Sequence, residues 1–98
     1  LECIYVACLV YELRKRGLDV QTEIVVPEFY DGVRLDVGWR LDILVEGKVI
    51  IETKAVEKII PVHEAQLLTY LKLSQRRLGF LINFNTKLIK DGIKRMIL

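Results

Sequence analysis

The feature that most constrains this chain is a pair of apolar segments, residues 37–45 and 48–55, joined by a Glu-Gly turn. Both segments have the apolar and β-branched composition of strands inside a sheet, so we expect a hairpin. Charged residues interrupt the pattern at Asp42 in the first segment and at Glu52 and Lys54 in the second. Because a buried charge is costly without a partner, we expect these residues to act together.

The length of the loop between the two strands decides whether the charges meet. A two-residue loop would set Asp42 opposite Ile51 and on the other face of the sheet from Glu52. A three-residue loop that includes Lys48 would set Asp42 directly opposite Glu52. We predict the longer loop or an equivalent bulge. Paired carboxylates bind a hard divalent cation, and the nearby ammonium of Lys54 can stabilise a phosphate or a nucleophilic water.

The rest of the chain predicts further helices and strands in one small domain. An amphipathic helix is expected over residues 1–16, ended by a glycine cap at Gly17. Its apolar residues are Ile4, Cys8, Leu9, Val10 and Leu13. We expect a strand over 20–27, which Pro27 ends or places at a sheet edge, and a turn at 30–33. A helix follows over 61–74, beginning at Pro61, and then strands over 78–84 and 93–98. The order is α-β-β-β-α-β with a terminal strand.

Cysteine usage and hydropathy restrict the class of protein. Cys3 and Cys8 lie five residues apart in the first helix, a spacing that does not suit a disulfide, so we expect buried, reduced thiols in a cytoplasmic protein. A single histidine and no C-x-x-C pair argue against a zinc site. No apolar run is long enough to cross a membrane. Because the chain begins at Leu1 and its first helix has no N-cap, we expect the natural N-terminus to be missing.

Charge is distributed unevenly along the chain. Residues 1–71 carry eight Lys/Arg and twelve Asp/Glu, whereas residues 72–98 carry seven Lys/Arg and one acid. A basic C-terminal third beside an acidic hairpin fits an enzyme that holds a polyanion next to a metal site. From charge alone, a solvated basic surface is the simpler interpretation. The basic triplet Arg14-Lys15-Arg16 is explained by its place at the negative end of the helix dipole, with contact to DNA as the alternative interpretation.

Several of these residues, in this order, resemble a known family. Asp42, Glu52 and Lys54 resemble the signature of the PD-(D/E)XK nuclease superfamily, an acid on one strand and (Asp/Glu)-x-Lys on the next. Residues 66–70, QLLTY, resemble the Q-x-x-x-Y helix motif of its RecB-like branch. Residues 1–5, LECIY, resemble the end of the G-x-x-E-x-x-Y signature of a small family in that superfamily. The phrases YELRKRG, HEAQLLTYL and LINFN also look like that family, so the resemblance covers essentially the whole chain.

The resemblance implies a fold and a set of roles. The fold would be restriction-endonuclease-like, an α/β (α+β) domain over residues 1–98 with a mixed central sheet flanked by helices. Asp42 and Glu52 would bind Mg²⁺ or Mn²⁺, with the Thr53 backbone carbonyl as a further ligand and Glu2 completing the site. Lys54 would orient the attacking water or offset charge on the phosphate. The supporting residues, which would contact the phosphate backbone or hold the catalytic side chains, are Gln66, Tyr70 and His63.

The predicted function is a metal-dependent endo- or exonuclease that hydrolyses phosphodiester bonds in DNA, with a homodimer as one option. Two alternatives stay open: a catalytically inactive nucleic-acid- or protein-binding module on the same fold, and an accessory subunit that dimerises through apolar faces. Each residue also has a simpler interpretation. These are a salt pair for Glu52 and Lys54, a helix-dipole contact for Glu2, core packing for Tyr70 and Trp39, and a helix cap for His63.

Overall fold

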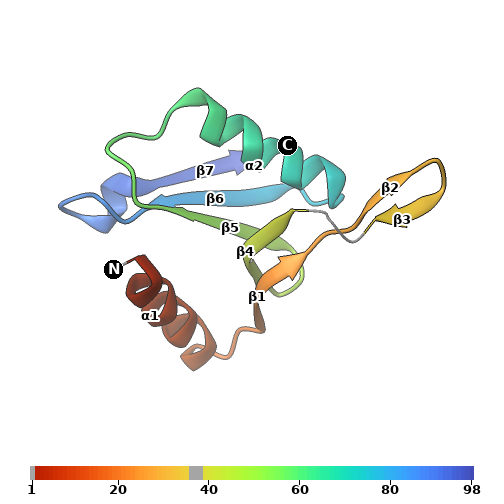
Figure 1. Ribbon diagram of the computed structural model, residues 1–98. Helices are drawn as coiled ribbons and strands as arrows, with labels where there is room; N and C mark the ends of the chain where they lie inside the picture. The colour runs from red at the N-terminus through yellow and green to blue at the C-terminus, as the bar shows by residue number, and fades with distance from the viewer. Residues whose placement is uncertain (1, 36–38) are drawn as a thin grey trace.

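The computed structural model describes residues 2–35 and 39–98 of this chain. The elements are α1 (Glu2–Lys15), β1 (Val20–Val25), β2 (Glu28–Tyr30), β3 (Val33–Leu35), β4 (Arg40–Val45), β5 (Val49–Lys54), α2 (Pro61–Leu73), β6 (Leu78–Asn83), a 3-10 helix η1 (Ile89–Gly92) and β7 (Ile93–Ile97). Figure 1 shows the main sheet as a middle layer, with α1 on one face and α2 on the other. The hairpin of β2 and β3 projects beyond the end of this sheet (Figure 1).

The five-stranded sheet has the order β1-β4-β5-β6-β7. The pair β5–β6 is parallel and its connection contains α2, whereas the other pairs are antiparallel. The strand β1 is an edge strand that ends two residues before Pro27, as expected for a residue with no N–H to donate. The predicted order is therefore confirmed for the two helices and the five strands of the main sheet, and so is the mixed sheet flanked by helices.

Each face of the sheet carries its own apolar cluster. The cluster under α1 consists of Val10, Val20, Ile43, Val45, Ile51 and Ile82. The cluster under α2 consists of Leu41, Leu44, Ile50, Leu67, Tyr70, Leu71 and Leu81. A Cβ on Gly79 would lie 3.0 Å from Leu67 Cδ1, so a glycine here lets α2 approach β6 closely. Since full burial of each such aliphatic side chain contributes about 1.5–3 kcal/mol, the central strands β4 and β5 hold the two layers together.

The β4–β5 hairpin has the register that the sequence predicts. The paired residues are Val45 with Val49, Leu44 with Ile50 and Ile43 with Ile51. The loop therefore contains three residues, 46–48, and two of them adopt left-handed backbone angles, with φ of 55° at Glu46 and 64° at Gly47. This register places Asp42 opposite Glu52, so the longer-loop prediction is confirmed.

The prediction of the buried face of α1 is correct only in part. Val10 is buried, and Val6, Leu9 and Leu13 are partly buried against the sheet. This stripe follows the i, i+3, i+4, i+7 spacing of one helix face, and Ile4 lies outside it with 58% of its surface exposed. Both cysteines, Cys3 and Cys8, are free and exposed, so the expectation of buried thiols is also corrected. The predicted face is therefore right at Leu9, Val10 and Leu13 and wrong at Ile4 and Cys8.

Residues 28–35 contain two strands that the sequence analysis did not predict. The expected turn at 30–33 is present, because Tyr30 pairs with Val33 across the two-residue loop Asp31-Gly32. The flanking strands β2 and β3 were missed because they are three residues long and mostly exposed. The expected strand over 37–45 is observed from Arg40 onward, and residues 36–38 lie outside the described part of the chain. The other strand and helix ends agree with prediction within two residues.

Candidate active site

The ladder between β4 and β5 ends at Asp42, where carboxylates replace the backbone pairing. The last described pair is Ile43 with Ile51. One residue further, the Asp42 backbone N–H donates to Glu52 Oε1 at 3.2 Å. The Thr53 backbone N–H and hydroxyl both donate to Asp42 Oδ2, at 2.9 and 3.1 Å. Each carboxylate therefore accepts a hydrogen bond from a backbone N–H of the opposite strand. These two contacts bring Asp42 and Glu52 together at the point where the strands separate.

The side-chain alternation of β4 also breaks at Asp42. Ile43 packs in the cluster under α1 and Leu44 in the cluster under α2, as alternation requires. Leu41 should return to the α1 side, but it packs in the α2 cluster instead. The register of β4 with its neighbour β1 skips Asp42 and Glu23, and Glu23 has a φ of 50°, an uncommon conformation for a residue other than glycine. This distortion opens the sheet at Asp42, so that residues from both helical layers reach one cleft.

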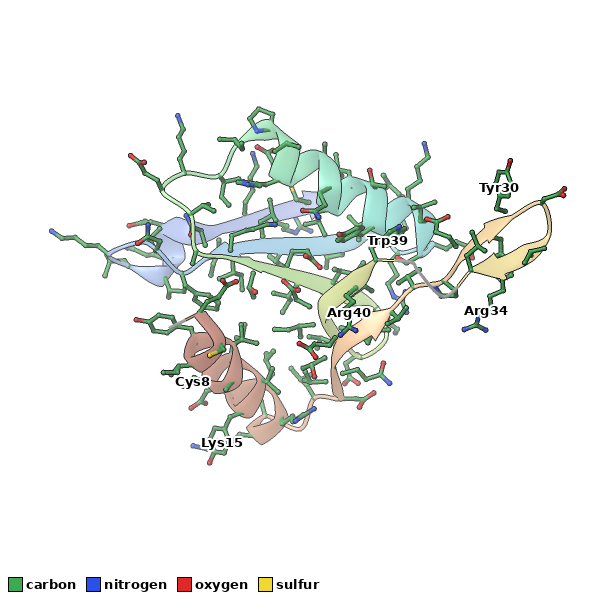
Figure 2. The ribbon with its side chains drawn as sticks, in the orientation of Figure 1. Cys8, Lys15, Tyr30, Arg34, Trp39 and Arg40 are labelled. Atoms are coloured by element: carbon green, nitrogen blue, oxygen red, sulfur yellow. The ribbon has the colours of Figure 1, made fainter. Side chains whose placement is uncertain are left out.

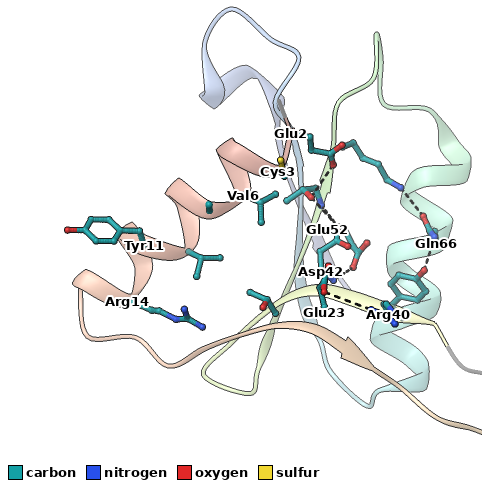
Figure 3. Close-up of a pocket in the computed structure, with 16 residues that line it drawn as sticks. Glu2, Cys3, Val6, Tyr11, Arg14, Glu23, Arg40, Asp42, Glu52 and Gln66 are labelled. Carbon is teal, nitrogen blue, oxygen red and sulfur yellow. Dashed lines mark hydrogen bonds and ion pairs between the residues drawn. The ribbon is translucent and has the colours of Figure 1, made fainter. Parts of the chain in front are cut away.

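The cleft has a volume of about 950 Å³ and is lined by residues of α1, β1, β4, β5 and α2 (Figure 3). Its charged lining residues are Glu2, Arg14, Glu23, Arg40, Asp42, Glu52 and Lys54. Gln66 and Tyr70 line the side formed by α2, and Thr53 lies beside the two central acids. The sequence-predicted residues Glu2, Asp42, Glu52, Thr53, Lys54, Gln66 and Tyr70 are thus all brought to a single cleft.

Burial and charge make Glu52 an unusual carboxyl group. Its residue surface is only 4% exposed. Burial, followed by the negative charge of Asp42, raises the pKa of Glu52 to about 7, although the Asp42 backbone N–H and the Lys54 ammonium oppose this shift. The pKa of Tyr70 is also raised, chiefly by burial, with the Glu52 and Asp42 charges adding to the shift. A cation placed between the two acids would remove this electrostatic penalty.

A chain of contacts connects Lys54 to helix α2. The Lys54 Nζ donates to Gln66 Oε1 at 3.2 Å, and Gln66 Nε2 donates to the Tyr70 hydroxyl at 2.7 Å. The Tyr70 ring stacks on Trp39, with ring centroids 4.5 Å apart and an angle of 11° between the planes. Trp39 Nε1 in turn donates to Glu28 Oε1 at 2.9 Å. Packing is therefore the role of Trp39, as predicted, and it supports the residues that hold the Lys54 ammonium at the cleft.

Glu2 and His63 occupy more peripheral positions than the other predicted site residues. The Thr53 hydroxyl, whose one proton goes to the nearer Asp42 Oδ2, has its oxygen 3.4 Å from Glu2 Oε1, and Glu2 lines the cleft beside it. Among residues 2–35 and 39–98, no group of three or more His, Cys, Asp or Glu residues is arranged to hold a metal ion. His63 Nδ1 accepts from the Ile60 backbone N–H at 3.1 Å. His63 therefore caps the start of α2, which was its simpler interpretation.

The donors around Asp42 suit a hard divalent cation. Asp42 and Glu52 offer carboxylate oxygens, the ligands that Mg²⁺ and Mn²⁺ prefer. The Thr53 backbone N–H donates to Asp42 Oδ2, and because the N–H and C=O of one strand residue point to the same side, the Thr53 carbonyl is directed toward β4. Because Mg²⁺ keeps several waters and is usually bound by one or two carboxylates together with substrate phosphates, a two-carboxylate site is sufficient.

Two arginines of the cleft were not predicted as site residues. Arg14 was assigned to the helix dipole, but it lines the cleft, where its Nη2 donates to the Val20 carbonyl at 2.8 Å. The signal was its spacing four residues after Val10, which puts it on the helix face that packs toward the sheet. Arg40 also lines the cleft, two residues before Asp42 on β4, and strand spacing could have indicated it.

Comparison with known families agrees with this geometry. A family model described as the PD-(D/E)XK nuclease superfamily matches residues 1–96. Searches among curated proteins and among solved structures found no match. Within the described residues, no helix is long and apolar enough to cross a membrane. The five-stranded mixed sheet between two helices is consistent with the restriction-endonuclease-like fold of this superfamily, whose members typically use divalent metal ions. The chain belongs to the PD-(D/E)XK nuclease superfamily.

Proposed function

We propose that this protein is a metal-dependent nuclease that hydrolyses phosphodiester bonds in DNA, with Asp42, Glu52 and Lys54 as its catalytic residues. The observation that carries the proposal is the mutual contact of Asp42 and Glu52 where the strands separate, with Lys54 lining the same cleft. On the resemblance of its sequence motifs, we also assign the chain to the G-x-x-E-x-x-Y family and the RecB-like branch of the superfamily.

Each residue has a defined role in this proposal. Asp42, Glu52 and the Thr53 carbonyl hold Mg²⁺ or Mn²⁺. When bound, such an ion polarises the phosphate and lowers the pKa of a coordinated water. The Lys54 ammonium donates to a phosphate oxygen or orients the attacking water. Glu2, whose carboxylate lies 3.4 Å from the Thr53 hydroxyl, completes the metal site directly or through a water.

Gln66 and Tyr70 are positioning residues in this proposal. Gln66 accepts a hydrogen bond from the Lys54 Nζ, and its own amide donates to the Tyr70 hydroxyl. Because the stacking on Trp39 restricts the Tyr70 ring, this chain limits where the Lys54 ammonium can go. Precise placement of a charged donor is what electrostatic stabilisation of a transition state requires.

The decisive test is a cleavage assay with isosteric variants that remove one charge at a time. Single-stranded, duplex and branched DNA, and RNA, are incubated with Mg²⁺, with Mn²⁺ or with a chelator. We expect cleavage only with metal, and a loss of at least about 100-fold in Asp42→Asn and Glu52→Gln, because both change groups that bind the metal directly. The matched control is Asp31→Asn, at the exposed turn of the β2–β3 hairpin.

Cleavage that persists in Asp42→Asn would rule out this site. Titration calorimetry of the metal-free protein with Mg²⁺ and Mn²⁺ provides an independent reading, with binding expected in the wild type and weakened in both variants. If the wild type shows no cleavage and no metal binding, the inactive binding module is favoured instead.

A further inference from the structure

Two positive side chains of the cleft have no part in the catalytic proposal. Arg14 comes from α1 and Arg40 from β4, so they reach the cleft from different layers of the fold. In Figure 3, Asp42 lies between these two arginines. Four acids also line the cleft, namely Glu2, Glu23, Asp42 and Glu52. A phosphodiester backbone therefore needs these cations to offset repulsion from the acids as it enters.

The contacts described hold Arg14 in place but use few of its N–H donors. Its Nη2 donates to the Val20 carbonyl at 2.8 Å, which secures the side chain between α1 and β1. A guanidinium has five N–H donors, and this contact uses one. Arg16 differs, because it pairs with Glu12 at 2.9 Å on the exposed side of the same helix and does not line the cleft. The sequence triplet thus contains one cleft residue and one matched residue outside the cleft.

Arg40 is held only weakly by its neighbour. Its Nη1 lies 3.9 Å from Glu23 Oε2, and the two side chains are 66% and 77% exposed. Exposed ion pairs of this kind contribute little to stability. A phosphate oxygen can therefore displace Glu23, since guanidinium–phosphate bonds are charge-assisted and frequently bidentate. Arg40 also sits two residues before Asp42, close to where the scissile phosphate would lie.

We propose that Arg14 and Arg40 bind the backbone phosphates of a nucleic-acid strand on the two sides of Asp42. This inference rests on the proposed function, because it places the phosphodiester between them at Asp42, Glu52 and Lys54. The recognised chemistry is the phosphate backbone, so the two arginines contribute affinity and alignment without sequence preference.

Binding measured without metal tests this inference separately from cleavage. The full chain is titrated in EDTA against labelled single-stranded and duplex DNA of the same sequence, from about 50 to 200 mM salt, with fluorescence anisotropy as the readout. DNA affinity falls between these two salt concentrations, and the fold-change of this fall depends on the number of phosphate contacts. Losing one contact makes the fold-change about three times smaller, and losing two makes it about ten times smaller. We expect the threefold effect in Arg14→Gln and in Arg40→Gln, and the tenfold effect in the double variant. Arg16→Gln should keep the salt dependence of the wild type.

Two further variants separate charge from folding. Arg14→Lys keeps the positive charge, so it should keep the wild-type salt dependence even if it shifts the thermal unfolding temperature. Glu23→Gln removes the carboxylate that competes for Arg40, so it should tighten binding about two- to threefold at low salt. The two DNA probes show whether a single strand or a duplex supplies the phosphates.

The outcomes distinguish this inference from the nuclease proposal. If Arg14→Gln and Arg40→Gln bind DNA as Arg16→Gln does, or if the wild type does not bind, the inference is overturned even when cleavage is observed. If both arginines set the salt dependence but the wild type cleaves nothing with Mg²⁺ or Mn²⁺, the nuclease proposal fails and the phosphate-binding role stands.

Discussion

The β4–β5 hairpin and the β2–β3 hairpin show how differently one chain can use the same motif. The strands β4 and β5 lie inside the five-stranded sheet and are mostly buried between α1 and α2. The strands β2 and β3 form a separate two-stranded sheet, and Figure 2 shows Tyr30 and Arg34 on this hairpin, away from the main sheet. Phe29 and Tyr30 are 65% and 75% exposed. Packing on both faces constrains the first hairpin, whereas the second depends on its turn.

This difference explains where a charged site can be built. A one-residue slip in β4 or β5 would move an entire apolar set out of its cluster, so the register is strongly specified. That register is what places Asp42 opposite Glu52. In β2 and β3 the same slip would exchange exposed side chains for exposed side chains. A precise pair of carboxylates is therefore expected in the buried hairpin and not in the projecting one.

Inserting one residue in each hairpin should give the largest difference in stability between the two hairpins. One alanine inserted after Ile51 shifts Glu52 away from Asp42 and breaks the parallel pairing with β6, so we expect a loss of about 3 kcal/mol or more in unfolding free energy. One alanine inserted after Asp31 lengthens an exposed turn, and we expect a loss of less than about 1 kcal/mol. Urea denaturation measures both. Equal losses would show that the projecting hairpin is as constrained as the buried one.

Side-chain truncation sharpens the same comparison without changing the backbone. Ile50 is fully buried in the cluster under α2, and Ile50→Ala should cost about 2–5 kcal/mol in unfolding free energy. Val33 is 59% exposed on β3, and Val33→Ala should change the same quantity by about 0.5 kcal/mol or less. Thermal or urea unfolding of the metal-free protein is the measurement. A large effect at Val33 would mean that its side chain is buried in solution.

The pH dependence of stability should report the buried carboxyl group of the first hairpin. The pKa of Glu52 is raised from 4.5 to about 7 by burial and by the Asp42 charge. Between these values the unfolded chain loses the proton that the folded protein keeps. Stability of the metal-free protein should therefore fall as the pH rises through this window, by about 3 kcal/mol at most, and change no further above it.

Glu52→Gln should remove this pH dependence, whereas the exposed Glu57→Gln should keep it. Urea unfolding at a series of pH values measures both. Unchanged pH dependence in Glu52→Gln would assign the effect to another group. Metal affinity should show the opposite trend and strengthen toward pH 7, because the carboxylate must lose its proton to bind a cation.

The smallest expected effect concerns the contact between the two hairpin regions. Trp39→Phe keeps a ring that can stack on Tyr70 but removes the indole N–H that donates to Glu28 at the base of β2. We expect a loss of about 1 kcal/mol in unfolding free energy, the usual net value of one hydrogen bond. Glu28→Gln should cost less, since its amide oxygen can still accept. No change in Trp39→Phe would show that the projecting hairpin does not depend on this contact.

Much of this fold could be predicted because strong local signals agree with each other. Pro61 and the apolar spacing that follows it indicate α2, and the run at 78–84 indicates β6. The β4–β5 register could be predicted because only a three-residue loop sets Asp42 directly opposite Glu52. The resemblance to the superfamily adds Gln66 and Tyr70, which line the cleft in the structure.

Other features could not be predicted because they depend on contacts between distant segments. The buried face of α1 depends on the part of the sheet that the helix covers, and its many apolar residues allow more than one face. The strands β2 and β3 are too short to give a periodic signal. The break in β4 at Asp42 involves the distorted Glu23 on the neighbouring strand. The spacing of Arg14 from Val10 indicated its helix face, but only the packing of α1 places that face at the cleft.

The amino-acid sequence by itself determined the order of the two helices and the main-sheet strands, the central hairpin and the meeting of Asp42 with Glu52, because strand register follows from sequence spacing. Only the tertiary structure decided what surrounds that pair. The opening of the sheet at Asp42, the contact of Lys54 with Gln66 and the two arginines at the cleft arise where α1, β4 and α2 converge. Local spacing specifies which face a side chain points to, but only packing specifies what it meets there.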